Sequence, residues 1–264
     1  MTKQNNVFKS IRRCSVALVV PLFMMAEAKA SIEDVHEIID ICTSSERIMK
    51  DYAMIQMGIS YHDPKKDMEE TLARLHTEMA DLEKHKVTKD LHDEEVALHK
   101  EWDAIDVELA LPPSKEVALR LHHHINTFAK HCETLAEHLA TDTGNPAEHY
   151  VVLIARLNLD VQELAGAYIM KAWGAIPDGE YYQEVADILK DFNQAYDELQ
   201  SSESNMVSDK VKAKLKVLKK HFMVFEFMAE SKSGRFVPLL IAKKAEKIYA
   251  ETIKILKLEE SEVE

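Results

Sequence analysis

The stretches SERIMKDYAMIQMGISYHDP, residues 45–64, and VQELAGAYIMKAWGAIPD, residues 161–178, decide the fold of this chain. Each is apolar at helical spacing, places a tyrosine six residues before a glycine, and ends in a turn that contains proline and aspartate. These positions are Tyr52 and Gly58 in the first stretch, Tyr168 and Gly174 in the second. The same helix and turn recur at an offset of 116 residues, which predicts a duplicated helical unit.

Helical periodicity extends from these stretches through the rest of the chain. Apolar residues recur three and four positions apart from Ser31 onward, and only six glycines and seven prolines interrupt 264 residues. A sheet protein needs turn residues far more often, so the pattern predicts helices. The expected helices cover residues 32–61, 64–86, 88–110, 114–140, 146–175, 179–201, 208–230 and 235–258.

The strongest predicted linker lies between the fourth and fifth helices, from Thr141 to Pro146. Ser114 and Ser208 are the expected N-caps of the helices that follow them. The short connections favour antiparallel neighbours. We therefore predict an all-α fold of two tandem antiparallel four-helix, up-down-up-down bundle modules, residues 31–143 and residues 144–264.

The first thirty residues have the features of a secretory signal peptide. A basic start precedes an apolar run, and Ala28-Lys29-Ala30 is a small-x-small site, which predicts cleavage after Ala30 and a periplasmic product. No later stretch is apolar enough to span a bilayer. Removing residues 1–30 takes away five positive charges and one negative charge, so the formal charge falls from −13 to about −17. Such an acidic chain is not expected to bind nucleic acid.

The segment from Ser45 to Pro64 resembles the first helix of a known family. Its Ser-Glu-Arg run, Tyr52, Gly58 and Asp63-Pro64 turn are similar to the type IV pili methyl-accepting chemotaxis transducer N-terminal domain. That domain is in turn similar to the periplasmic domain of nitrate/nitrite sensor kinases. Cys42 stands where the family has an earlier arginine, and Glu163 replaces the arginine in the second copy.

The resemblance implies an extracytoplasmic sensing module that binds a small ligand between first helices. In the nitrate/nitrite sensors, arginines bind the anion at a dimer interface, and a tandem copy would reproduce that interface within one chain. The ligand-binding residues that follow from the resemblance are Arg47, Tyr52 and Glu163. Because a carboxylate opposes an anion, an ion pair between Arg47 and Glu163 is the alternative.

Histidines offer a second type of site. His92 and His99 lie seven residues apart on one helix, and His131 lies on the next, so a histidine-lined groove for Cu or Zn is one interpretation. Residues seven apart are separated by ~10.5 Å along a helix and cannot share one metal. Surface histidines with a structural role are the simpler interpretation, so we expect no cofactor.

Cys42 and Cys132 remain after the predicted cleavage, and in an antiparallel bundle they lie at similar height. Export permits oxidation, so a disulfide and two buried free thiols are the alternatives.

Motifs of catalysis are missing from the sequence: it has no serine elbow, phosphate-binding glycine loop or Cys-x-x-Cys pair. The expectation is a non-enzymatic sensory or ligand-binding accessory protein without a transmitter. Its expected partners are a small anion or another small molecule and a membrane-bound signalling protein. The alternatives are a helical interaction module without a ligand and a periplasmic metal-binding protein.

Overall fold

The computed structural model describes residues 32–82 and 89–263, and every regular element in these residues is a helix. The helices are α1 Ile32–Gln56, α2 Pro64–Leu82, α3 Lys89–Leu109, α4 Lys115–Thr143, α5 Pro146–Trp173, α6 Asp178–Ser201, α7 Asp209–Ala229 and α8 Pro238–Val263. The prediction of an all-α fold is confirmed. The predicted signal peptide, residues 1–30 with its cleavage site after Ala30, lies outside the described residues.

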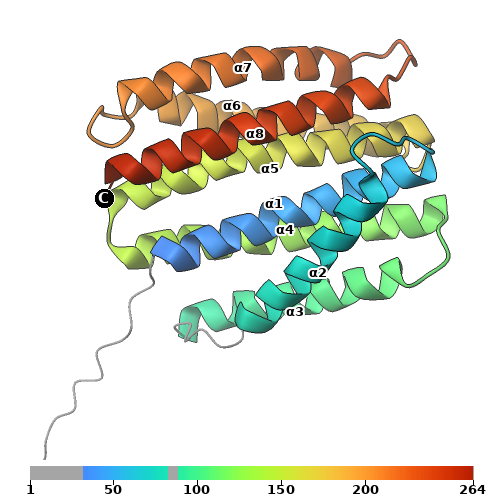
Figure 1. Ribbon diagram of the computed structural model, residues 1–264, viewed down its shortest axis with the longest axis horizontal. Coiled ribbons are helices and arrows are strands. Elements are labelled where there is room, and N and C mark those ends of the chain that lie inside the picture. Colours follow the sequence, from blue (N-terminus) through green and yellow to red (C-terminus); the bar gives the residue numbers. More distant parts are fainter. Residues whose placement is uncertain (1–31, 83–88, 264) are drawn as a thin grey trace, which may run out of the picture.

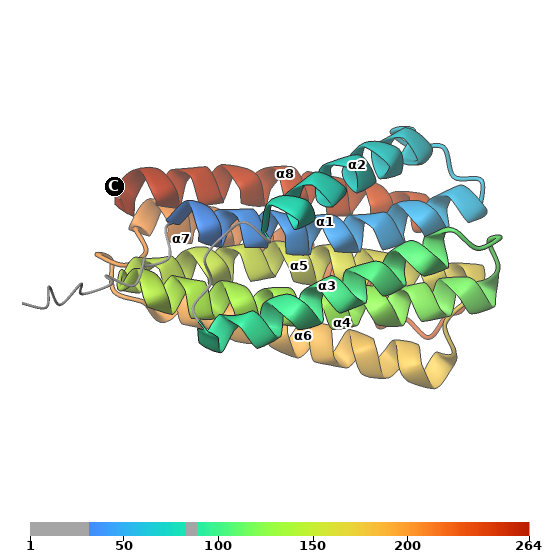
Figure 2. The ribbon, with the colours of Figure 1, turned by 90° about the horizontal axis from the view of Figure 1, so that it is seen from below.

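Two helices, α1 and α5, form the centre of the molecule. They pack along each other, and Figure 1 shows them running in the same direction. Helix α1 also contacts α2 and α4, whereas α5 also contacts α4, α6 and α8. Helices α2 and α3 lie on one side of this centre and α6 and α7 on the opposite side, and Figure 2 gives the perpendicular view.

Helix α5 is central because it is apolar around most of its circumference. Its buried residues run almost without interruption from Val151 to Met170, and a helix that is apolar all round requires neighbours on every side. Burial of large side chains such as Phe128, Phe192 and Phe222 stabilises the surrounding helices, at about 1.5–3 kcal/mol for each fully buried side chain.

The ends of α1 and α5 carry the same backbone motif. Gly58 and Gly174 both have a positive φ, of 67° and 77°. The next residue after each glycine donates its N–H to a methionine carbonyl five positions back, Ile59 to Met54 and Ala175 to Met170. This is the Schellman motif, for which glycine is the favoured residue because a side chain opposes that conformation.

Several predicted helix ends are corrected by these caps. Helix α1 ends at Gln56 rather than at residue 61, because Gly58 turns the backbone out of the helix. Helix α8 begins at Pro238 rather than at residue 235, and it continues to Val263. The two serine N-caps are confirmed: Ser114 accepts the N–H of Val117 and Ser208 that of Val211, both at 3.2 Å.

The predicted linker is a tight reversal of the chain. Helix α4 continues to Thr143, Gly144 caps it with a φ of 70°, and Asn145 caps α5 by accepting the N–H of Ala147. Helices α4 and α5 then pack against each other. The two helices therefore form a hairpin instead of one long rod.

Candidate functional site

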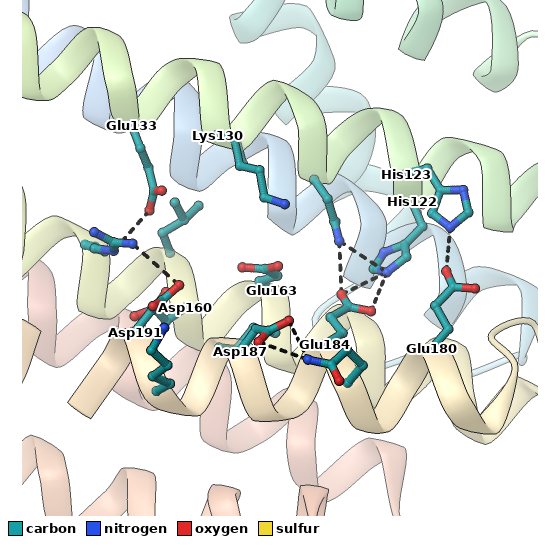
Figure 3. A pocket seen from close by; sticks show the side chains of 17 residues that line it. His122, His123, Lys130, Glu133, Asp160, Glu163, Glu180, Glu184, Asp187 and Asp191 are labelled. Carbon is teal, nitrogen blue, oxygen red and sulfur yellow. Dashed lines mark hydrogen bonds and ion pairs between the residues drawn. The ribbon is translucent and has the colours of Figure 1, made fainter. Parts of the chain in front are cut away.

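A groove opens between α4 and α6, and α5 forms its floor (Figure 3). Its volume is about 470 Å³, within the range of ~300–1,000 Å³ that is typical of small-molecule sites. Seven carboxyl groups line it: Glu133 from α4, Asp160 and Glu163 from α5, and Glu180, Glu184, Asp187 and Asp191 from α6. Only three lysine or arginine side chains accompany them, Lys130, Arg156 and Lys190. The groove is therefore acidic.

Polar bridges connect the two walls at one end of the groove. The Nε2 atom of His122 lies 2.9 Å from Glu184, and Asn126 donates its amide to the same carboxylate at 3.0 Å. His123 also pairs with Glu180 (Figure 3). These contacts join α4 to α6 across the floor of α5.

An arginine connects the elements near the other end. The guanidinium of Arg156 lies 3.5 Å from Glu133 of α4 and 3.6 Å from Asp191 of α6. It also lies 3.8 Å from Glu137. Three carboxylates therefore share one cation, so their negative charge is only partly neutralised.

Glu163 lies in the middle of the floor between these two sets of bridges, and Asp160 lies nearer the arginine end, beside Asp191 (Figure 3). Asp160 is only 3% exposed, and its Oδ2 atom has no hydrogen-bond partner. Most buried polar atoms in proteins are paired, since an unpaired one costs about 1–3 kcal/mol. Asp160 therefore places in the floor of the groove a carboxyl oxygen that receives no hydrogen bond from the protein.

Burial and mutual repulsion oppose ionisation of these carboxyl groups. Burial raises the pKa of Glu163 from 4.5 to about 8, and Glu184 and Glu133 add to this effect. The pKa of Asp160 is raised well above its ordinary value by burial and then by the charges of Glu163 and Glu133. Without a ligand, the protonated form of both groups is therefore favoured.

A further carboxyl group lies beneath the floor, on α1. Glu46 is completely buried, and neither of its carboxyl oxygens has a hydrogen-bond partner. Burial raises its pKa well above the ordinary value, and repulsion by Glu163, Glu184 and Glu133 adds to the shift. The acidic cluster thus extends from the groove into the contact between α1 and α5.

The three residues implied by the family resemblance lie apart. Arg47 contacts α8, where its guanidinium lies 3.9 Å from Glu246 and 4.7 Å from the ring centre of Tyr249. Tyr52 is buried, and its hydroxyl has no hydrogen-bond partner. Glu163 lines the groove between α4 and α6. The structure therefore does not gather the three around one ligand.

The alternative, an ion pair between Arg47 and Glu163, is contradicted by the contacts of both residues. Because α1 and α5 run in the same direction, equivalent positions on the two helices point to opposite flanks of the pair. Arg47 faces α8 on one flank, and Glu163 faces α4 and α6 on the other.

Lys50 is a buried cation that the sequence analysis did not single out. It is 1% exposed and forms an ion pair with Glu246 of α8. Its Nζ atom also lies 3.5 Å from Gln162 and 4.0 Å from Asp51. Together with Arg47, it supplies positive charge on the flank of the central pair that α8 covers.

Two of the three histidines proposed as metal ligands pair with carboxylates instead, and the Nε2 atom of His99 is buried without a hydrogen-bond partner. His131 lies 2.9 Å from Glu94, and His92 lies 3.6 Å from Glu95. Within residues 32–82 and 89–263, no three His, Cys, Asp or Glu side chains converge in a way that could hold a metal ion. His92, His99 and His131 therefore form no such cluster.

Cys42 of α1 and Cys132 of α4 are both buried, and they lie side by side as free thiols. Burial raises the pKa of the Cys42 thiol, and its contact with Cys132 adds to the shift. The alternative of buried free thiols describes this structure, and the disulfide stays a prediction.

The positions of acidic residues in the sequence already indicated the groove, although the helical pattern alone did not. Asp160 and Glu163 are acidic residues in the mainly apolar middle of helix α5. On α6, Glu180, Glu184, Asp187 and Asp191 recur four, three and four residues apart, which places four carboxylates on one face. The two signals together would have indicated an acidic surface between these helices.

The chain was compared with protein-family models, with curated proteins and with solved structures. No match was found in any of the three comparisons. Among the described helices, none is both long and apolar enough to cross a lipid bilayer.

Proposed function

We propose that this protein is a non-enzymatic sensory or ligand-binding accessory protein of the periplasm, and that its ligand site is the groove between α4, α5 and α6. The single observation that carries this proposal is the buried Asp160 carboxyl group, which faces a groove of about 470 Å³ without a donor for its Oδ2 atom. A ligand that donates a hydrogen bond would satisfy it.

The proposal includes a duplicated fold, with modules at residues 31–143 and 144–264 that follow a signal peptide at residues 1–30. Two observations support the duplication. Helices α1 and α5 end in the same Schellman motif at Gly58 and Gly174, and each has a tyrosine six residues earlier. The packing of α1 on α5 also corresponds to the contact between first helices that the family resemblance implies.

The proposal places the ligand on the flank opposite Arg47. On the Arg47 flank, the guanidinium already lies beside the carboxylate of Glu246 and over the ring of Tyr249. On the groove flank, carboxyl groups outnumber cations, which opposes binding of nitrate or another anion. A ligand without negative charge is therefore favoured.

Thermal unfolding of the purified protein tests the proposal. The panel consists of nitrate, nitrite and other inorganic anions, Cu²⁺ and Zn²⁺, and organic amines. We expect saturable stabilisation by at least one class of ligand, retained in Arg47→Ala and reduced in Asp160→Asn. If no compound shifts the unfolding temperature, the ligand-binding function is wrong. If stabilisation is lost in Arg47→Ala and kept in Asp160→Asn, the proposed site is wrong.

Exposed apolar side chains favour a second candidate function, an interaction module without a ligand. On α7, Phe227 is 77% exposed and Met223 is 56% exposed. Leu239 and Leu240 at the start of α8 are also exposed. Sedimentation of the wild type and of Phe227→Ser tests this candidate. Association that the substitution abolishes, without any ligand response, would favour it over ligand binding.

A further inference from the structure

Carboxyl groups line the groove along its length, four on α6, two on the α5 floor and one on α4. Its lining residues on α6 extend from Glu180 to Asp191, and those on α4 extend from His122 to Glu133. Eleven residues of helix correspond to ~16 Å. A compact ion would meet only part of this surface, whereas an extended ligand would follow it.

Several carboxyl groups of the groove have no cation in contact among the described residues, so a ligand with more than one positive group would fit it best. At one end His122 and His123 partner Glu184 and Glu180, and at the other Arg156 is shared by Glu133 and Asp191. The Oδ2 atom of Asp160 has no hydrogen-bond partner, and the nearby cations, Arg156 for Asp160 and Lys130 for Glu163, act on these carboxyl groups through their charge. Asp187 is bound by the neutral amide of Gln183, at 3.1 Å to each oxygen. Three carboxyl groups along the middle are therefore left without a cation in direct contact.

Apolar surface lies among these carboxyl groups. Ala129 of α4, Leu159 of α5 and Ile188 of α6 all line the groove. A hydrated metal ion gains nothing from such surface, whereas methylene groups that are removed from water there bind more favourably. The combination of separated carboxylates with apolar contacts fits a chain of methylene groups that carries an ammonium at each end.

Other ligand classes fit less well. An anion would meet uncompensated carboxylates. A tightly bound metal ion requires several converging ligands, and the residues that the structure describes contain no such group. Ammonium groups donate up to three hydrogen bonds each and accept none, which suits a site that consists mainly of acceptors.

We propose that the groove binds a linear aliphatic diamine or polyamine, with one ammonium between Asp160 and Glu163 and the next along the α6 row at Asp187. This inference rests on the proposed ligand-binding function and names its ligand class. The methylene chain lies against Leu159 and Ile188, and the ammonium donates to the Oδ2 atom of Asp160.

Binding of a cation at this position also ionises the floor. The charged and titratable groups around Glu163 are Lys130 and Glu133 of α4, Glu184 and Asp191 of α6, Glu46 of α1 and Asp160 of α5. Most are acidic, so an added ammonium stabilises the carboxylate form of Glu163. Binding near pH 7 is therefore expected to release protons into the buffer.

Calorimetry of the full-length protein tests the inference with 1,4-diaminobutane and spermidine as probes. Butylamine carries one ammonium, and Mg²⁺ carries two charges without methylene groups, so the two serve as comparison ligands at equal ionic strength. We expect both polyamines to bind at least about tenfold more tightly than either comparison ligand, because a second charge-assisted contact contributes about 1.5 kcal/mol or more. Enthalpies measured in two buffers of different ionisation heat report the expected proton release.

Matched variants locate the site. Asp160→Asn and Glu163→Gln each remove one carboxyl group from the floor, whereas Glu69→Gln removes an exposed one from α2. We expect the first two to weaken 1,4-diaminobutane binding by about tenfold or more and the third to change it by less than about twofold. Thermal unfolding of each variant confirms that it is folded.

The outcomes separate this inference from the function on which it rests. Equal affinity for Mg²⁺ and 1,4-diaminobutane, or unchanged diamine binding in both floor variants, would overturn the ligand class. If another class of compound then stabilises the protein and Asp160→Asn reduces that effect, the proposed function stands without the amine. If no compound binds, both fail.

Discussion

The two flanks of the α1–α5 pair have opposite chemistry. On one flank, Arg47 and Lys50 extend from α1 toward Glu246 of α8, so two cations face one carboxylate. On the other flank, Asp160 and Glu163 extend from α5 toward α4 and α6, where a groove remains and carboxyl groups outnumber cations. The predicted repeat aligns Arg47 with Glu163, so this position carries opposite charges in the two halves of the chain.

Under the proposed duplication, this difference shows how two equivalent helices can acquire one site instead of two. Where the position is arginine, its long side chain packs against Tyr249 and is paired. Where it is glutamate, the shorter side chain leaves space, and its burial raises its pKa to about 8. Side chains of opposite charge therefore face one another on the first flank, whereas carboxyl groups that a ligand can pair outnumber the cations on the second.

The largest effect is expected from breaking the paired flank. Replacing Lys50 by methionine removes the cation that faces Glu246 and the buried Asp51. Breaking a buried pair costs about 3–5 kcal/mol, and we expect the lower end, about 3 kcal/mol, because Arg47 also faces Glu246. Urea denaturation measures the loss.

Two variants serve as controls for that measurement. In Lys50→Met/Glu246→Met both charged partners are removed, so much of the stability is expected to return. In Lys66→Met only an exposed pair with Glu70 on α2 is lost, and the cost is expected to stay below about 0.5 kcal/mol. A cost below about 1 kcal/mol for Lys50→Met would show that this flank is not held by the ion pair.

The groove flank is expected to respond to pH in the direction of a buried acid. The carboxyl group of Glu163 ionises near pH 4.5 in the unfolded chain and keeps its proton to about pH 8 in the folded protein. The unfolded state therefore binds fewer protons across this window, so the free energy of unfolding falls as pH rises from about 4.5 to 8. Asp51, whose pKa burial raises to about 6, acts in the same direction over the lower part of this range.

Glu163→Gln is expected to flatten that dependence. Relative to the wild type, the variant gains stability progressively between pH 5 and pH 8. The gain is expected to exceed about 1.4 kcal/mol, the equivalent of one pKa unit. Denaturation at several pH values measures it, with the exposed Glu69→Gln as the control. Parallel profiles of wild type and Glu163→Gln would contradict the assigned burial of this group.

The smallest effect concerns the two tyrosines of the repeat. Tyr168 accepts the N–H of Val237 at 3.0 Å, whereas the hydroxyl of Tyr52 is buried without a partner. We expect Tyr168→Phe to cost about 1 kcal/mol, and Tyr52→Phe to be neutral or slightly stabilising. The difference between the two unfolding free energies measures how far the copies have diverged. Equal costs would contradict the hydrogen-bonding difference.

Local patterns predicted the helices well because their causes are local. The spacing of apolar residues indicated the helical class, and Ser114 and Ser208 cap their helices as expected. The end of α1 was placed too late because the sequence reading extended the apolar pattern past Gly58, where the backbone turns left-handed. A glycine is compatible with either conformation, so the pattern alone did not reveal the stop.

The groove could not be predicted in the same way, because three helices contribute to it. The separation of α4 from α6 depends on how both pack on α5, and no sequence spacing encodes that distance. The family resemblance directed attention to Arg47, whose equivalent position in the second helix points to the opposite flank. Asp160 was overlooked because its neighbours are apolar.

The adjacent sulfur atoms of Cys42 and Cys132 have a consequence for chemical labelling. Alkylating reagents react with the thiolate, and burial both raises the pKa of the Cys42 thiol and blocks access to it. In the thiol form that the structure describes, each sulfur becomes reactive only when α1 and α4 separate. The rate at which these thiols are alkylated therefore reports how often the contact between α1 and α4 opens. The measurement requires no engineered probe.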